Sequence, residues 1–305
     1  GEPGGASSGG SPSTNLKGGA SAAYVCKAGE TYGNPLQGMG QVQTISAPTM
    51  GKVTYFAFIE GPMWVASQQT LFFSDNVSPE RIWKVKPPAT TPELVLENVG
   101  ANGLGVDSND QLLIADQVQR RITRIDPASG SPTPTLVVST GNAKPNDLLM
   151  RSNGAIYFSD PQMQVGVYYV SPAGVVSPAL MVGQSPNGIA LSPDEKTLYV
   201  GNVNSREITA FSLADDGAID AASAKLFATT TGNTLDGMAV DCAGNLYAST
   251  QTGVEVISPS GMPIGSIPTG EASNVTFGGA DRKTLYATSR SVLKYVTLAV
   301  PGLPD

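Results

Sequence analysis

The sequence contains no histidine, and this absence excludes more functions than any other feature of its composition. Without an imidazole there can be no Ser-His-Asp triad, no HExxH zinc helix and no histidine general base. If the protein is an enzyme, its chemistry must use carboxylates, amides, hydroxyls or a metal held by oxygen atoms.

Charged residues are also scarce, at 14% of the chain against roughly 25% in an average soluble protein. The sequence instead has 35 glycines and 23 prolines, which form turns. Few lysines and glutamates together with many turn formers argue against a helical bundle and favour an all-β fold.

No basic patch and no long apolar run are present. The formal net charge is −7, and no basic run exceeds the pair Arg120-Arg121. Nucleic acid is therefore not an expected partner, because binding it requires a surface that neutralises phosphates. No stretch approaches 18 apolar residues, so we predict no transmembrane segment.

The first 15 residues, GEPGGASSGGSPSTN, are nearly all Gly, Ser and Pro. Such a segment cannot bury a core, and we interpret residues 1–20 as a flexible tether and residues 21–305 as one folded domain. A tether of this kind would follow a cleaved export or lipoprotein signal, so we expect an exported monomer that is periplasmic, secreted or attached to a surface through a lipid. In an exported protein Cys26 and Cys242 are candidates for a disulfide, the alternative being two separate buried thiols.

A short apolar strand that ends in small or polar residues recurs six times, at intervals of 39 to 48 residues. The copies are LFFSD (71–75), LLIAD (112–116), IYFSD (156–160), LYVGN (198–202), LYAST (246–250) and LYATS (285–289). Another strand precedes each copy across a hairpin turn, a third follows it, and a fourth, less regular one follows in most copies. Four strands in each period of about 40 residues are the signature of a propeller blade.

The sequence therefore predicts an all-β, six-bladed β-propeller with four antiparallel strands per blade. Segments 41–45 and 52–56, which precede the first copy, are predicted to supply the missing outer strand of the last blade and so close the ring. A pair of β-sandwiches, the rival all-β fold, does not predict a fixed period.

Ten or eleven residues before each copy stands a residue with a side-chain carbonyl or carboxylate. These residues are Glu60, Asn102, Asn146, Asn187, Asp236 and Asn274. Equivalent positions of a propeller lie around one mouth of the central channel, so six oxygen donors should converge there. Oxygen donors without thiolate or imidazole favour Ca²⁺, with Mg²⁺ or Mn²⁺ as alternatives. The competing interpretation is that Asn-Gly and Asp-Gly pairs are turn signals, although each blade already has a hairpin turn a few residues later.

Several motifs also resemble those of a known family. EGPMW, LFFSD, PNDL, IYFSDP, SPNGIALSPDEKTLYV, LDGMAVDCAGNLY and FGGADRKTLYATSR are similar to the blade motifs of the SMP-30/gluconolactonase/LRE-like family, over roughly residues 50–297. The resemblance implies a six-bladed propeller with one divalent metal, usually calcium, and hydrolysis of lactones. It also implies that Glu60, Asn187 and Asp236 are metal ligands, with Asn146 as a fourth. Asn102 matches a substrate-contacting position, and we assign Asn274 to the substrate as well. Sugar-lactonase members carry an arginine where this chain has Gly100, so specificity for gluconolactone does not follow.

The leading hypothesis is a hydrolase of lactones or related esters in which the cation polarises the carbonyl group. Asp236 is the preferred catalytic carboxylate and Asp147 a weaker second, the alternative being that Asp147 only orients Asn146. A non-catalytic exported binding propeller with a structural metal is the main rival, and a strictosidine-synthase-like propeller a weaker one. Asp75, Asp116 and Asp160 end their strands and are expected to cap turns.

Overall fold

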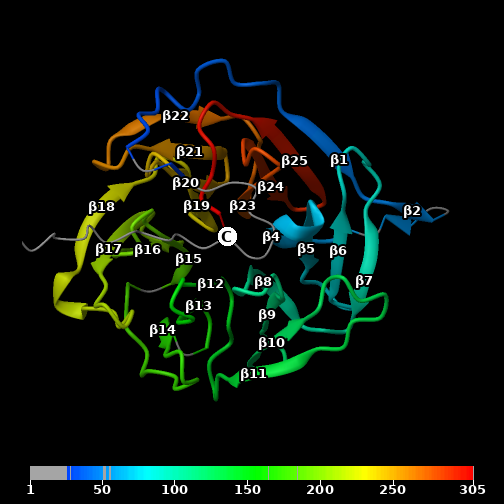
Figure 1. Cartoon of the computed structure of the whole chain (residues 1–305), viewed down its shortest axis with the longest axis horizontal. Helices are drawn as coiled ribbons and strands as arrows, with labels where there is room; N and C mark the ends of the chain where they lie inside the picture. The colour runs from blue at the N-terminus through cyan, green and yellow to red at the C-terminus, as the bar shows by residue number, and fades with distance from the viewer. Residues whose placement is uncertain are drawn as a thin grey trace, which may run out of the picture.

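The computed structural model describes residues 26–27, 29–50, 53–54, 56–163, 165–183 and 185–304. The predicted tether, residues 1–20, lies outside these described residues. Within them, six antiparallel sheets surround a central axis in chain order, as Figure 1 shows. The predicted six-bladed β-propeller is thus confirmed.

Each blade begins with the strand nearest the axis, and the later strands follow outward. Blade 1 contains β4 (Ile59–Val65), β5 (Thr70–Asp75), β6 (Arg81–Val85) and β7 (Glu93–Glu97). Blade 2 contains β8 (Ala101–Val106), β9 (Leu112–Asp116), β10 (Arg121–Ile125) and β11 (Thr135–Ser139). Blade 4 contains β15 (Pro186–Leu191), β16 (Thr197–Asn202), β17 (Glu207–Ser212) and β18 (Lys225–Thr229). Blade 5 contains β19 (Met238–Val240), β20 (Leu246–Thr250), β21 (Gly253–Ile257) and β22 (Pro263–Ile267).

Blade 3 departs from the predicted four strands, because its sheet has three: β12 (Leu148–Met150), β13 (Ile156–Asp160) and β14 (Gly166–Val170). The segment after β14 makes only two isolated bridges to it, Val170 with Val176 and Val167 with Leu180. Pro178 lies between these bridges, and a proline lacks the N–H group that a continuous ladder requires.

The last blade, blade 6, joins the two ends of the propeller. It contains β23 (Asn274–Gly278), β24 (Thr284–Ser289), β25 (Val292–Thr297) and, as its outer strand, β1 (Gln43–Ser46). β1 pairs antiparallel with β25, so the N-terminal segment closes the ring as predicted. The second predicted segment, 52–56, does not join this sheet, because β3 (Val53–Thr54) pairs with β2 (Thr49–Met50) as a separate hairpin.

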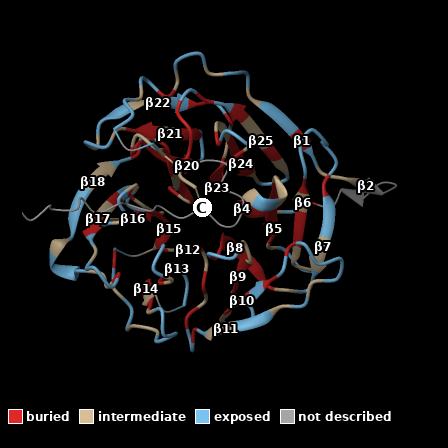
Figure 2. Ribbon diagram, in the orientation of Figure 1, coloured by how far each residue is buried: buried red, intermediate tan, exposed pale blue. Residues whose placement is uncertain are grey.

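The core lies between neighbouring blades, and Figure 2 shows the buried residues concentrated on the inner strands. Trp64 of blade 1 stacks on Tyr286 of blade 6, with ring centroids 6.0 Å apart. Tyr247 of blade 5 meets Phe277 of blade 6 edge to face at 4.9 Å. These aromatic side chains therefore hold blades together, as their strand spacing predicts.

The helices within the described ranges are two single 3-10 turns, η1 (Ala66–Gln68) and η2 (Ala221–Ser223). No helix in the described part of the chain is long and apolar enough to cross a membrane.

A disulfide joins Cys26 to Cys242, whose Cα atoms are 5.4 Å apart. Cys242 lies in the turn between β19 and β20, and its backbone N–H donates to the Pro301 carbonyl at 2.8 Å. One turn of blade 5 therefore holds both the N-terminal segment and the C-terminal segment of the chain.

Candidate functional site

The six predicted ring residues all lie at or just before the start of an inner strand. Glu60, Asn102 and Asn187 belong to β4, β8 and β15, and Asn274 is the first residue of β23. Asn146 and Asp236 precede β12 and β19 by two residues. The Asn102-Gly103 and Asn187-Gly188 pairs lie within extended strands, so the interpretation of these pairs as turns is wrong.

Glycines following the ring residues allow the blades to approach closely. The residue after the donor is glycine in four blades: Gly61, Gly103, Gly188 and Gly237. A Cβ atom on Gly188 would lie 2.0 Å from the Asp236 carbonyl oxygen, and one on Gly237 would lie 2.0 Å from the Asn274 amide. These glycines are required by the contact between blades, because a side chain has no room there.

In blade 3 the residue that follows the donor is Asp147, where four other blades have glycine. Its Oδ2 atom accepts a hydrogen bond from the Ile189 N–H in blade 4 at 2.9 Å. Its Oδ1 atom accepts from the Leu148 N–H at 3.1 Å and, across the channel, from Asn274 Nδ2 in blade 6 at 3.5 Å. These contacts support the alternative in which Asp147 is a structural acceptor. The expected side-chain partner was Asn146, whereas the side chain that donates to Asp147 is that of Asn274.

Carboxylates dominate the electrostatics of the ring. Burial raises the pKa of Glu60 to about 8, and the Asp147 charge adds to this, against the lowering effect of hydrogen bonds from Gly61, Asn274 and Ser273. Burial also raises the pKa of Asp147 to about 6. Burial, and then the charges of Glu60, Asp147 and Glu271, raise the pKa of Asp236. Burial and mutual repulsion thus disfavour the ionised form of these carboxyl groups, and a cation at the ring would favour it.

One amide oxygen of the ring has no hydrogen-bond partner. Asn187 Oδ1 is buried and accepts no hydrogen bond from the described residues, whereas buried polar atoms are normally paired. Since the surrounding donors are also oxygens, the site fits a hard divalent cation such as Ca²⁺. Among the described residues no three Asp, Glu or Cys side chains are arranged to hold a metal by themselves, so a cation bound here would also need amide oxygens such as that of Asn187.

Hydroxyl groups beside the start of the inner strands link neighbouring blades, and the sequence reasoning missed them. The Ser74 hydroxyl donates to the Asn102 carbonyl at 2.6 Å, joining blade 1 to blade 2. Ser249 Oγ contacts the Gly237 and Ser273 carbonyls at 2.8 and 2.9 Å, joining blade 5 to blade 6. Both serines are the fourth residue of their repeat copy, and Ser159 and Thr288 occupy that position in two other copies. The recurrence of small hydroxyl residues at this position was the feature of the sequence from which these contacts could have been predicted.

The aspartates that end the repeat copies cap turns, as expected. Asp75 accepts hydrogen bonds from the backbone N–H groups of Ala57 and Phe58, at 3.1 and 2.9 Å. Asp160 accepts from the N–H of Gln162 at 2.9 Å. Asp116 accepts from the N–H of Gln119 and pairs with Arg121.

Comparisons with known proteins agree with this architecture. The model of the SMP-30/gluconolactonase/LRE-like region matches residues 58–291. A gluconolactonase of Zymomonas mobilis is 29% identical over 297 residues, covering 83% of this chain and 82% of its own length. A pentonolactonase of Haloferax volcanii is 23% identical, covering 75% of this chain and 80% of its own length.

Solved structures also resemble this chain. A gluconolactonase from Xanthomonas campestris superimposes with a TM-score of 0.75 and 31% identity, covering 87% of this chain and 91% of its own. A calcium-binding protein, regucalcin, from Agrobacterium tumefaciens shares the fold, with a TM-score of 0.68 and 19% identity over 81% of this chain and 92% of its own. The chain therefore belongs to the SMP-30/gluconolactonase/LRE-like family.

Proposed function

We propose that the protein hydrolyses lactones or related esters and that a divalent cation, Ca²⁺ in first place, binds at the ring. Glu60, Asn146, Asn187 and Asp236 are the proposed ligands. The observation that carries the proposal is the buried Asn187 Oδ1 atom, which has no hydrogen-bond partner among the described residues. The repulsion among the carboxylates of Glu60, Asp147 and Asp236 supports it. Family membership and the two lactonase relatives support the reaction class.

The cation, when bound, would polarise the substrate carbonyl and stabilise the negative charge that develops on its oxygen. Among the described residues, no protein hydrogen bond engages the carboxylate of Asp236, in contrast to that of Asp147. Asp236 is therefore the residue we assign to take a proton from the attacking water and return it to the leaving oxygen of the opened ester. Asn102 and Asn274 are assigned to orient the substrate.

The test is hydrolysis of a panel of γ- and δ-lactones, sugar lactones and aryl esters, each with and without a chelator. We expect chelator-sensitive turnover that Asp236→Asn reduces at least 100-fold, in keeping with the ~10²–10⁴-fold typical of a general base. The matched control is Asp215→Asn, which removes an exposed carboxylate and should leave turnover unchanged. Bound metal without turnover on any substrate would instead identify a binding propeller.

A further inference from the structure

The central channel continues past the ring into a cavity of about 170 Å³. Inner strands of all six blades contribute to its wall, and Leu303 and Pro304 of the C-terminal segment form part of it. Asp147 and Asn274 line it at the end that faces the ring. Glu60, Asn146, Asn187 and Asp236, the proposed metal ligands, are not among its lining residues.

The C-terminal part of the wall is fixed in place. The Leu303 N–H donates to the Val240 carbonyl at 3.1 Å, and Arg282 donates through Nη2 to the Leu303 carbonyl. Gly302 lies directly against the Phe277 ring, since a Cβ atom there would be 2.0 Å from it. Figure 1 shows the end of the chain near the axis of the propeller, in keeping with the position of Leu303 and Pro304 in the cavity wall.

The cavity lining is mainly apolar and adaptable. Three methionines reach it from different blades: Met63 from blade 1, Met150 from blade 3 and Met238 from blade 5. Methionine has a flexible, polarizable side chain that adjusts to ligands of different shape. Ile189 and Phe277 add further apolar surface.

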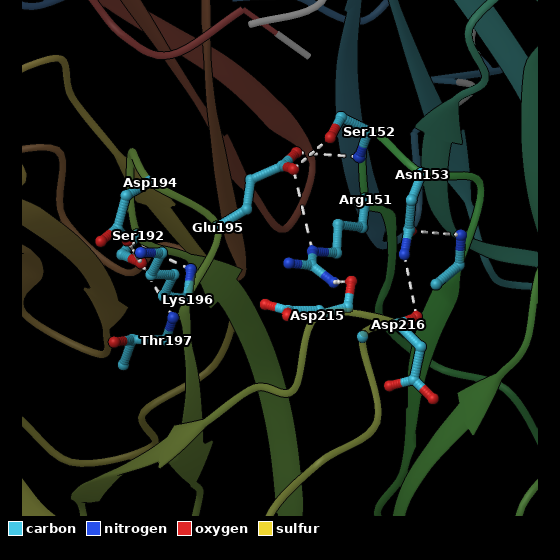
Figure 3. Close-up of polar contacts among 12 residues, drawn as sticks. Arg151, Ser152, Asn153, Ser192, Asp194, Glu195, Lys196, Thr197, Asp215 and Asp216 are labelled. Carbon is cyan, nitrogen blue, oxygen red and sulfur yellow. Dashed lines mark hydrogen bonds and ion pairs between the residues drawn. The ribbon is translucent and has the colours of Figure 1, made fainter. Parts of the chain in front are cut away.

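Both carboxylates in the lining already accept hydrogen bonds from protein groups. At the rim, the Glu195 carboxylate accepts from the Ser152 N–H at 2.8 Å and from its hydroxyl, and lies 3.8 Å from Arg151 Nε, as Figure 3 shows. At the inner end, the Asp147 carboxylate accepts hydrogen bonds from Leu148, Ile189 and Asn274. These acceptor atoms are already engaged by protein donors and the rest of the lining is mainly apolar, so a neutral ligand is favoured.

We propose that this cavity is a second binding site, which adjoins the ring at Asn274 and lies beyond the four proposed metal ligands, for a small, neutral and mainly apolar molecule. Its size sets the scale of the ligand, because an apolar cavity of about 150 Å³ accommodates benzene. A six-membered carbocycle with one hydroxyl group has the matching volume and can place that hydroxyl near the amide of Asn274.

The probe is cyclohexanol, with myo-inositol as a polar control of the same ring size. Binding is measured by ligand-observed NMR titration and by the change in melting temperature, with and without a chelator. We expect saturable binding of cyclohexanol but not of inositol, and we expect the chelator to leave the affinity unchanged, because the metal ligands lie outside the cavity.

Ala239→Leu fills part of the cavity, since Ala239 is a half-buried lining residue. It should weaken cyclohexanol binding at least tenfold, whereas Ala128→Leu, in an exposed turn, should not change it. Met150→Phe provides the same test if Ala239→Leu does not fold. The proposal is overturned if cyclohexanol does not bind, or if both filled variants bind it as tightly as the parent protein.

Discussion

Asn187 provides a direct test of the proposed metal ring at the level of a single residue. Its buried Oδ1 atom makes no protein hydrogen bond, so removing it deletes no intramolecular bond to that oxygen. We expect Asn187→Ala to change the stability of the chelated protein by less than about 1 kcal/mol. The same variant should lose most of the rise in melting temperature that added Ca²⁺ gives the parent protein.

The measurement is thermal unfolding of both proteins with chelator and with calcium. An undiminished response of Asn187→Ala to calcium would remove Asn187 from the ligand set.

Gly188 tests the close contact between blades 4 and 5. An added Cβ atom would meet the Asp236 carbonyl oxygen at 2.0 Å, and this neighbour is backbone that cannot rotate away. We expect Gly188→Ala to lower the free energy of unfolding by about 3 kcal/mol, as for an overpacked core. The control is Gly130→Ala, at an exposed turn with no atom within 4 Å of the added carbon, which should change it by less than about 0.5 kcal/mol. Equal urea midpoints for the two variants would contradict the contact.

The sequence predicted that an oxygen donor stands near the start of each inner strand, because the donors recur at a fixed distance from each repeat copy. It could not predict that the Asp147 carboxylate reaches Asn274, since these residues are 127 positions apart and their contact depends on the width of the channel. The role of the glycines was likewise hidden, because Asn-Gly has the same sequence signal in a turn and in a tightly packed strand.

At the level of secondary-structure elements, strand β1 closes the circle of blades by pairing with β25. Ile45 is its buried residue, 3% exposed, and packs in a cluster with Trp64 of blade 1 and Leu293 of blade 6. We expect Ile45→Ala to cost about 3 kcal/mol, within the usual range for a buried isoleucine. Gln43→Ala, at an exposed position of the same strand, should cost less than about 0.5 kcal/mol.

Chemical unfolding of the two variants checks this prediction. Equal stabilities would mean that β1 does not fasten blade 1 to blade 6 through its buried face.

The blades also differ in how well their strands could be predicted. The inner three strands of each blade follow from the repeat, because buried strands have a regular apolar pattern. The outer strands are half-exposed and carry a weaker pattern. This is why a fourth strand was expected in blade 3, where Pro178 interrupts the ladder and only isolated bridges form.

For the whole molecule, the raised pKa values of the ring predict how stability depends on pH when metal is removed. The folded-state pKa is about 8 for Glu60 and about 6 for Asp147, above the ordinary values of 4.5 and 3.8. Between pH 5 and 8.5 the folded chain therefore binds more protons than the unfolded chain, so stability falls as pH rises. We expect the chelated protein to melt at least about 3 °C lower at pH 8.5 than at pH 5.5.

Calorimetry at the two pH values, with chelator and with Ca²⁺, tests this. Calcium should reduce the difference, because a bound cation offsets the charges. A chelated protein that is more stable at pH 8.5 would show that the ring carboxylates are not the controlling groups.

The disulfide acts on the whole chain because it closes a loop of 216 residues. In the chain-entropy description, a crosslink over so long a loop stabilises the folded state by about 5 kcal/mol. We expect replacement of both Cys26 and Cys242 by serine to lower the free energy of unfolding by roughly that amount. Urea unfolding measures the loss, and a reductant should destabilise the parent protein but not the double variant.

The close contact at Gly237 has a consequence for how the ring can change during evolution. Because a Cβ atom there would overlap the Asn274 amide, a side chain at position 237 is tolerated only if residue 274 becomes smaller at the same time. A side chain introduced at position 237 therefore requires a compensating change at position 274 in the next blade, and we expect sequences with only the first change to be less stable. Divergence of specificity among such propellers should then proceed through paired substitutions in adjacent blades, or through the loops around the mouth, where this constraint does not apply.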